Sequence, residues 1–306
     1  EHLRLELIKT LITSSQYFTS KLRLSYFELM CVHHPKTALQ EIKDHIDALT
    51  VDLMPIKRLA QKTARKQKKS APFFFGLQSA KERILHFKPS VNKRKRPHFE
   101  LNGSTYSVEH LVIAQLKLLG RAAVRSENQL WSTLFVRLFM DVIFAPLDGV
   151  LPVPNLSAPL DYTDPLFAHR RSALFEKRLN HIRQGRSEEL LSRTERYRGA
   201  LIRGCNWNIN VEQIVNKLKP DVLATLLQIW LNHLPFERHG LPDLLLFAGN
   251  KVRLKSAYPA GIPSSLCFIE VKSPNDRCSD AQLYWHDRLL SLGVLVEVWK
   301  IQPIKI

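Results

Sequence analysis

Hydrophobic residues recur at helical spacing through the first fifty residues. They fall in three stretches, 3–12, 22–29 and 39–49, and His34-Pro35 separates the second stretch from the third. This pattern predicts short helices joined by short turns. Helical spacing returns after a basic stretch, and we predict further helices at 107–120, 130–144, 165–184, 187–202, 210–217 and 220–234, with a proline-rich loop at 150–165.

The last sixty residues follow a different pattern. Short apolar runs at 243–248, 266–272 and 294–299 predict three strands. Between the second and third, the Ser-x-x-Gln form at 279–282 is typical of a capping box and predicts a helix that ends near 292. A helix that connects two strands of one sheet favours a parallel pair. The sequence therefore predicts an α/β core that follows a largely helical region.

Two carboxylates and a lysine lie on the predicted strands. Asp243 begins the first strand, and Glu270 and Lys272 lie near the end of the second. Residues two apart on a strand face the same side, so Glu270 and Lys272 project together. Val271 then points away and leaves its carbonyl oxygen near the same place. Asp243, at the start of the neighbouring strand, can meet them.

This combination suits phosphodiester hydrolysis. Two carboxylates and a backbone oxygen form a hard, oxygen-rich site for Mg²⁺ or Mn²⁺. Such an ion lowers the pKa of a bound water and neutralises charge on a phosphate. Lys272 would orient or help to deprotonate that water and stabilise the oxyanion. The alternative is a pair of solvated strand-end carboxylates, but the Asp-(x)n-Glu-x-Lys arrangement beside a capped helix favours a metal-dependent nuclease.

The charge of the chain indicates a polyanionic partner. The formal net charge is +17, which favours DNA first and an acidic membrane second. Residues 56–96 hold fourteen Lys or Arg and a single acid, and they include the cluster Lys93, Arg94, Lys95 and Arg96. Basic residues at this density would contact phosphates, although a solvated linker is the alternative. No apolar run reaches the roughly 18 residues that a membrane span needs, so we expect no membrane partner.

Cysteine and histidine add little to this picture. The four cysteines form no C-x-x-C pair, which argues against a zinc ribbon or a disulfide framework and fits a reducing, intracellular compartment. His286 lies four residues after Gln282, so the two share a helix face. The sequence leaves open whether Gln282 faces a substrate or packs against the core.

Several segments together resemble a known family. They are Gly-Leu-Pro-Asp-Leu at 240–244, Ile-Glu-Val-Lys-Ser-Pro-Asn-Asp-Arg at 269–277, Gln282 with Trp285, and Leu-Gly-Val-Leu-Val-Glu-Val at 292–298. They resemble the virus-type replication-repair nuclease (VRR-NUC) module and, more closely, the Fanconi-associated nucleases. The resemblance continues upstream through 108–111, 126–127, 131–135, 141–144, 159–161 and 170–171, so it covers roughly residues 100–306. Ser273 departs from the glycine of the family.

The resemblance implies a fold and a more complete site. It implies a PD-(D/E)xK restriction-endonuclease-like α/β core with a helical insertion in a nuclease domain over 98–306, preceded over 1–97 by the end of an all-α, tetratricopeptide-like region. A family Glu matches Glu127, which would join Asp243, Glu270 and Val271 in holding two metal ions. Arg277, Gln282 and the cluster Lys93 to Arg96 would contact the substrate. The family's more N-terminal DNA-binding domain has no evident counterpart here, and a chain that begins with Glu1 is expected to be part of a longer one.

The implied activity is that of a structure-specific DNA nuclease. It would cut near 5′ flaps, act as a 5′-to-3′ exonuclease and serve interstrand-crosslink repair, in a nucleus or in a bacterial cytoplasm or nucleoid. Branched DNA would be its partner, with no small molecule beyond the metal ions. A Holliday-junction resolvase is an alternative, but those are compact dimers, and the insertion at about 150–235 favours a monomeric flap nuclease. A non-catalytic DNA-binding module is a third possibility, which intact Asp243, Glu270 and Lys272 disfavour.

Overall fold

The computed structural model describes residues 5–6, 20–44, 53–67, 78–90, 97–126, 128–150, 156–164, 166–232, 240–247 and 266–304. The predictions for Lys93 to Arg96, for Glu127 and for most of the first helix fall outside these ranges. The chain forms two compact units. The sheet unit comprises residues 78–140, 180–225 and 239–306, and the helical unit comprises residues 1–77, 141–179 and 226–238.

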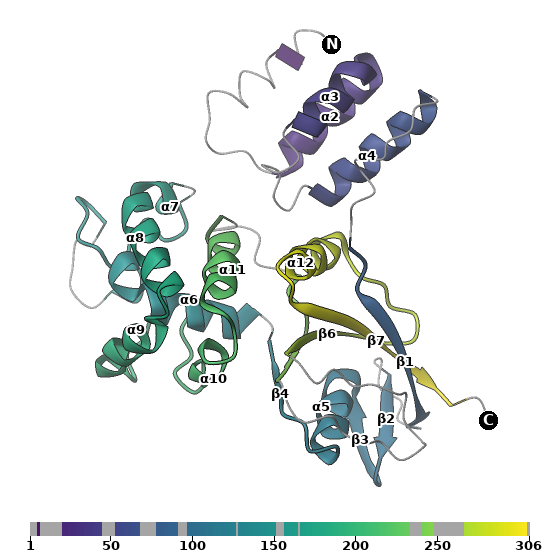
Figure 1. Ribbon diagram of the computed structural model, residues 1–306, viewed down its shortest axis with the longest axis vertical. Helices are drawn as coiled ribbons and strands as arrows, with labels where there is room; N and C mark the ends of the chain where they lie inside the picture. Colours follow the sequence, from purple (N-terminus) through teal and green to yellow (C-terminus); the bar gives the residue numbers. More distant parts are fainter. Residues whose placement is uncertain are drawn as a thin grey trace. The chain divides into compact units, whose positions relative to one another are not determined.

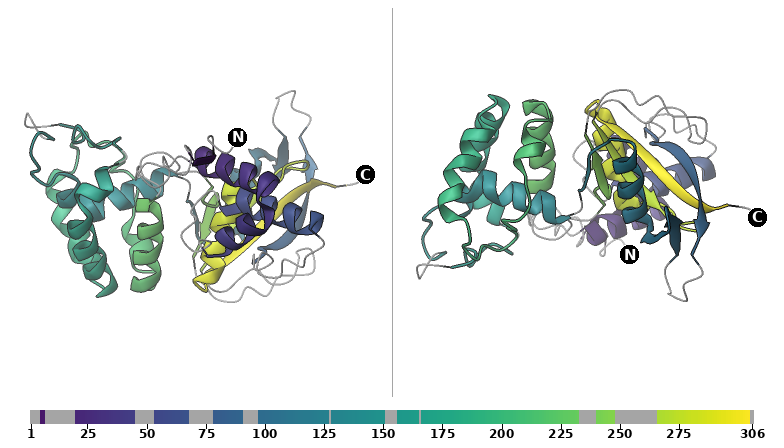
Figure 2. Two further views of the ribbon diagram at one scale, coloured as in Figure 1. Left: turned by 90° about the horizontal axis from the view of Figure 1, so that it is seen from above. Right: turned by 90° about the horizontal axis from the view of Figure 1, so that it is seen from below.

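A seven-stranded mixed sheet dominates the sheet unit, with the strand order β3-β2-β1-β7-β6-β5-β4 (Figure 1). Its strands are β1 (Lys81–Pro89), β2 (His98–Leu101), β3 (Ser104–Ser107), β4 (Ala123–Arg125), β5 (Leu244–Leu246), β6 (Cys267–Lys272) and β7 (Leu295–Pro303). The long strand β7 lies between β1 and β6 and is parallel to both, while the remaining neighbours are antiparallel. In Figure 2, β7 is the long yellow strand that leads to the C-terminus. The three predicted C-terminal strands are confirmed as β5, β6 and β7, and so is the parallel pair.

Strand β1 was not predicted. It lies inside the basic stretch, where the sequence analysis expected phosphate-binding residues or a linker. Arg83, Leu85 and Phe87 face the interior while the residues between them are exposed, which is the alternation of a strand with one buried face. Arg83 is itself buried because it pairs with Glu297 on β7, at 2.9 Å between Nε and Oε2 and 3.0 Å between Nη2 and Oε1.

The hairpin of β2 and β3 was also missed. Asn102 and Gly103 form its two-residue turn, with φ of 49° and 76°. Positive φ at both central positions is the geometry that an Asn-Gly pair favours in hairpins. The local signal was therefore present in the sequence, although the strands on either side are only four residues long.

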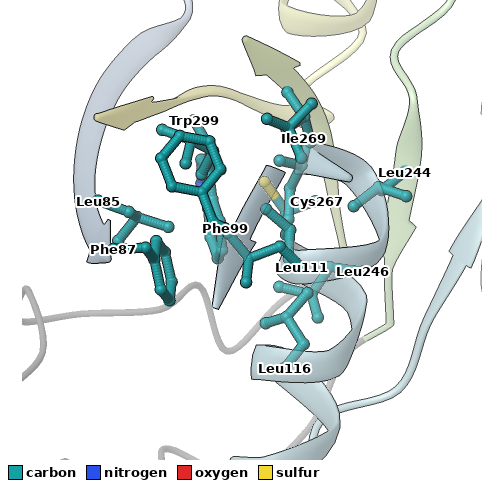
Figure 3. Packing of buried hydrophobic residues seen from close by; sticks show 14 residues of the cluster. Leu85, Phe87, Phe99, Leu111, Leu116, Leu244, Leu246, Cys267, Ile269 and Trp299 are labelled. Carbon is teal, nitrogen blue, oxygen red and sulfur yellow. The ribbon is translucent and has the colours of Figure 1, made fainter. Parts of the chain in front are cut away.

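One face of the sheet packs against α5 (Val108–Leu118). Figure 3 shows this core, in which Leu85, Phe99, Leu111, Ile269 and Trp299 meet from four strands and one helix. Helix α5 occupies the predicted span, but Ser107 at its N-cap bonds Glu109 and His110 instead of the helix backbone. Because β6 turns alternate residues to this core, Glu270 and Lys272 face the other side of the sheet.

Helix α12 (Asp280–Ser291) contacts the sheet on that second face (Figure 1). The predicted capping box is confirmed, because Ser279 and Gln282 exchange backbone and side-chain hydrogen bonds. Between α5 and α12, the described residues form the helices α6 (Asn128–Ile143), α7 (Phe167–Arg170), α8 (Ser172–Arg183), α9 (Ser187–Thr194), η2 (Glu195–Tyr197), α10 (Glu212–Val215) and α11 (Pro220–Asn232).

Helix α6, predicted at 130–144, is buried almost throughout and is kinked at Phe139. Its Arg137 is buried and forms ion pairs with Glu195 and Glu212. The helix predicted at 187–202 ends earlier, at Thr194 followed by one 3₁₀ turn, and the helix predicted at 210–217 shortens to four residues.

The helical unit contains α2 (Ser20–His33), α3 (Pro35–Asp44) and α4 (Leu53–Lys66). The break predicted at His34-Pro35 separates α2 from α3. Tyr26 on α2 donates to the Glu41 carboxylate on α3, and burial with this carboxylate raises the pKa of Tyr26. The tetratricopeptide-like character of this region stays a prediction. No described helix combines the length and apolarity that crossing a membrane requires.

Candidate active site

Asp243 lies opposite Glu270 at the edge of the β5–β6 pair. Leu244 pairs with Ile269 in this antiparallel register, and one further step along the register brings Asp243 against Glu270. Directly opposed residues of an antiparallel pair project from the same face. Oδ2 of Asp243 accepts a hydrogen bond of 2.7 Å from the backbone N–H of Val271. The structure therefore brings the two predicted carboxylates together.

The backbone around Asp243 is held from two sides. The N–H of Ser126, at the end of β4, donates to the carbonyl of Asp243 at 2.8 Å, and the Ser126 hydroxyl donates to the carbonyl of Pro242. On the other side, Gly240 adopts a φ of +103°, and a Cβ at this position would lie 2.5 Å from the carbonyl carbon of Ala281. Only glycine permits this approach, so the Leu-Pro-Asp segment passes directly beside the start of α12.

Lys272, Glu270 and Gln282 form a closed triangle of contacts. Nζ of Lys272 lies 2.9 Å from Oε1 of Glu270 and 3.0 Å from Oε1 of Gln282. Nε2 of Gln282 donates to Oε1 of Glu270 at 2.6 Å. Gln282 therefore lies at the predicted site, and its contact with a substrate stays a prediction.

Gln282 also belongs to the cap of α12. Its Oε1 accepts from the backbone N–H of Ser279 at 2.8 Å, and its own N–H donates to the Ser279 hydroxyl. One amide side chain thus serves the first turn of the helix and the two catalytic candidates on β6. The geometry of the site and the start of α12 depend on the same residue.

Burial strengthens the electrostatic interactions of this triangle. Glu270 and Lys272 are 1% and 4% exposed. Burial lowers the pKa of Lys272, but the charge and hydrogen bond of Glu270, with a smaller contribution from Asp276, outweigh that effect and raise it above its ordinary value. Lys272 is therefore an ammonium group at neutral pH, which favours its predicted role in stabilising negative charge over a role in removing a proton.

The carboxylates fit a divalent cation. Asp243 and Glu270 supply hard oxygen donors on one face, and Oε2 of Glu270 is buried without a hydrogen bond from any described residue. A buried carboxylate oxygen of this kind is costly unless a cation or a donor satisfies it. Within the described ranges no three His, Cys, Asp or Glu side chains lie close enough together to hold a metal ion, so a complete ligand set would need a further residue such as Glu127.

Arg277 and Val271 are the other predicted site residues that the structure describes. Arg277 is exposed and its backbone N–H bonds the Asp276 side chain. The sequence reasoning did not single out Asp276, yet its Oδ2 lies 3.8 Å from Nζ of Lys272; its position four residues after the lysine was the available signal. The backbone N–H of Val271 donates to the Asp243 carboxylate. Metal binding by the Val271 carbonyl stays a prediction.

This combination of a mixed sheet and an Asp opposite a Glu-x-Lys strand fits the class of α/β nuclease cores. A family model, the VRR-NUC domain, matches residues 182–302. Residues 182–302 therefore resemble the VRR-NUC domain family, and the chain is similar to the Fanconi-associated nucleases, as the sequence motifs implied.

The relatives agree with this assignment. The Fanconi-associated nuclease 1 homolog of Schizosaccharomyces pombe is 32% identical over 206 residues, which cover 65% of this chain and 28% of the relative. The Pseudomonas aeruginosa homolog is 31% identical over 206 residues, or 64% and 34% of the two chains. Human Fanconi-associated nuclease 1 is 30% identical over 212 residues, or 65% and 19%. The chain thus matches about a third or less of the length of these relatives.

The same fold occurs in a solved structure. A crystal structure of paFAN1 bound to 1-nt 5′-flap DNA with a gap superposes with a TM-score of 0.66 at 23% identity. The match covers 100% of this chain and 52% of that one. At this identity the likeness establishes the fold.

Proposed function

We propose that this chain is a metal-dependent, structure-specific DNA nuclease that hydrolyses phosphodiester bonds near 5′ flaps. The observation that carries the proposal is the placement of Asp243 opposite Glu270, with Lys272 in contact with Glu270. Relatives named as nucleases and the DNA-bound solved structure support it. A 5′-to-3′ exonuclease activity and a part in interstrand-crosslink repair follow from the resemblance to the Fanconi-associated nucleases.

Asp243 and Glu270 would hold the metal, Mg²⁺ or Mn²⁺. Glu127 and the carbonyl of Val271 complete the ligand set in this proposal, and two ions can then be accommodated. A contact of Ser126 supports the role of Glu127. Ser126 directly precedes Glu127 in the chain, and its backbone N–H donates to the carbonyl of Asp243. When bound, the ions activate a water and neutralise charge on the phosphate.

Lys272 stabilises the developing negative charge on a phosphate oxygen, because its ammonium group is held at the site by Glu270 and Gln282. Gln282 keeps the Glu270 carboxylate oriented through its amide N–H. The oxygen of the attacking water bonds to phosphorus and gives up a proton, the bond from phosphorus to the leaving oxygen breaks, and the leaving oxygen takes up a proton. Holding Lys272 and Glu270 in place beforehand avoids reorganisation during the reaction.

The substrate is DNA with a branch or a flap. The net charge of +17 favours a polyanion, and Arg277 and the cluster Lys93 to Arg96 are the proposed phosphate contacts. We assign the seven-stranded sheet, which begins with β1, to the nuclease domain, and the helices that precede it in the chain to the end of a tetratricopeptide-like region. The proposal includes action as a monomer on DNA inside the cell, in the nucleus if the source is eukaryotic.

A cleavage assay with matched substrates tests this function. The chain and its Asp243→Asn variant are incubated with 5′-flap, 3′-flap and four-way-junction DNA of equal length, in Mg²⁺ and then in Mn²⁺. We expect the wild-type chain to cut the 5′ flap fastest, and the variant to bind DNA equally well without cutting it. Cleavage by the variant at the wild-type rate would contradict the site, and a preference for the four-way junction would favour a resolvase.

A further inference from the structure

His286 is a buried polar residue that the proposed mechanism does not use. It lies on α12, one helical turn after Gln282, and is 1% exposed. Neither of its ring nitrogens forms a hydrogen bond with any residue that the structure describes. A buried imidazole without partners is unfavourable, so its surroundings indicate what the ring is placed to do.

The two oxygens of Glu270 have different environments. Oε1 contacts both Lys272 and Gln282, at 2.9 and 2.6 Å. Oε2 is buried and has no hydrogen-bond donor within the described ranges. The group that faces it is the His286 ring, with Nε2 at 4.0 Å from Oε2. Two unsatisfied polar groups therefore face each other directly behind the site.

A small adjustment joins these groups. Hydrogen bonds between nitrogen and oxygen measure about 3 Å, so a movement of about 1 Å brings Nε2 and Oε2 into contact. The neutral imidazole with its proton on Nε2 provides the donor that the carboxylate oxygen lacks. Both atoms are shielded from solvent, which makes such a bond stronger than the same bond in water.

We propose that His286 is a positioning residue of the nuclease site. It donates from Nε2 to Oε2 of Glu270 and prevents the carboxylate from rotating, while Gln282 and Lys272 hold Oε1. The carboxylate is then fixed at both oxygens and presents one orientation to the divalent ion. This inference rests on the proposed function, since it assigns Glu270 as a metal ligand.

Direct measurement of metal binding tests the role of His286. The probe is Mn²⁺ without DNA, and its free concentration is followed by electron paramagnetic resonance. His286→Gln keeps a donor at a similar reach, whereas His286→Met has the same length without one. We expect His286→Met to weaken Mn²⁺ binding by about 10- to 100-fold, as for groups that orient a ligand, and His286→Gln to stay within about threefold of wild type.

Two controls separate this role from a structural one. Tyr284→Phe removes a buried polar atom from the same helix, and it should leave Mn²⁺ binding unchanged. His286→Leu is a second variant without a donor, for use if the Met variant does not fold, and unfolding temperatures are recorded for all of them. A mainly structural residue would show the same loss in the Gln and Met variants.

The outcomes distinguish this inference from the function on which it rests. If the wild-type chain shows no Mn²⁺ binding that Asp243→Asn removes, the metal site fails, and the inference fails with it. If the wild-type chain binds Mn²⁺ and His286→Met binds it equally well, the inference alone is overturned. Weak binding by both the Gln and the Met variants would overturn it as well.

Discussion

The guanidinium of Arg83 and the carboxylate of Glu297 form a bidentate ion pair inside the sheet, between the parallel strands β1 and β7. Their side chains are 5% and 8% exposed. Nε1 of Trp299 donates to the same carboxylate at 2.7 Å, and the Arg83 guanidinium lies over the Trp299 ring. The pair joins β1, which the sequence analysis missed, to the strand beside the proposed site.

Arg83→Leu should destabilise the sheet unit by about 3–5 kcal/mol, because it leaves the Glu297 charge buried without its partner. Urea unfolding followed by tryptophan fluorescence measures this loss. The matched control is Lys88→Ala on the same strand, which removes the exposed ion pair with Glu100 and should cost no more than about 1 kcal/mol. Equal losses in the two variants would contradict the assigned role of the buried pair.

Gln282→Glu should separate the two functions of this side chain. A glutamate still accepts from the N–H of Ser279 and keeps the cap, but it places a second negative charge beside Glu270 instead of a donor. We expect cleavage to fall by about 10- to 100-fold with a small change in stability. In the converse variant, Ser279→Ala, the free energy of unfolding should fall by about 1 kcal/mol, and the cleavage rate should fall less than in Gln282→Glu. Kinetics and thermal unfolding of both variants check this pattern.

Gly240→Ala should impair both folding and cleavage. The new Cβ would overlap the backbone of Ala281 at 2.5 Å, at a φ of +103°, so the segment that carries Asp243 must move away from α12. Gly293→Ala is the control, since it has a positive φ of +71° with open space around it and should cost only about 1–2 kcal/mol. If Gly240→Ala lowers stability and cleavage no more than Gly293→Ala does, the close approach of Gly240 to Ala281 is not needed for the site.

Glu127→Gln should reduce cleavage by more than about 100-fold, because it removes a proposed metal ligand, and even groups one step behind the ligands contribute 10- to 100-fold. Gln129→Ala, an exposed change two residues away, should have no effect. The assay uses 5′-flap DNA under single-turnover conditions. Normal cleavage by Glu127→Gln would remove this residue from the site.

The sequence predicted the three C-terminal strands of the sheet better than the strands that precede them in the chain. Strands β5, β6 and β7 are largely apolar, and β5 and β6 are buried along their whole length, as expected for strands that are covered on both faces; the Ser279–Gln282 cap has a local signature. Strand β1 escaped because its buried face includes Arg83, whose partner Glu297 lies 214 residues away. No local pattern shows that a charged residue will be neutralised by one so distant in sequence.

The sequence likewise predicted only part of the geometry of the candidate site. Glu270 and Lys272 were assigned to one face by the two-residue period of a strand. That Asp243 would lie opposite Glu270 depends on the register between β5 and β6, which the sequence did not specify. Gln282 was recognised as a capping residue, but its contact with Lys272 requires α12 to pack on the correct face of the sheet. His286 shares that helix face, and only its burial beside Glu270 indicated a role.

The double use of Gln282 has a consequence for local motion. Helix ends fray more readily than helix centres, and such openings occur without global unfolding. Each opening of the first turn of α12 would withdraw the side-chain amide of Gln282 from Glu270 and Lys272 at the same moment. The free energy of this opening therefore sets the fraction of molecules with a fully assembled site. Hydrogen exchange at the backbone N–H of Gln282 would report how often the first turn opens.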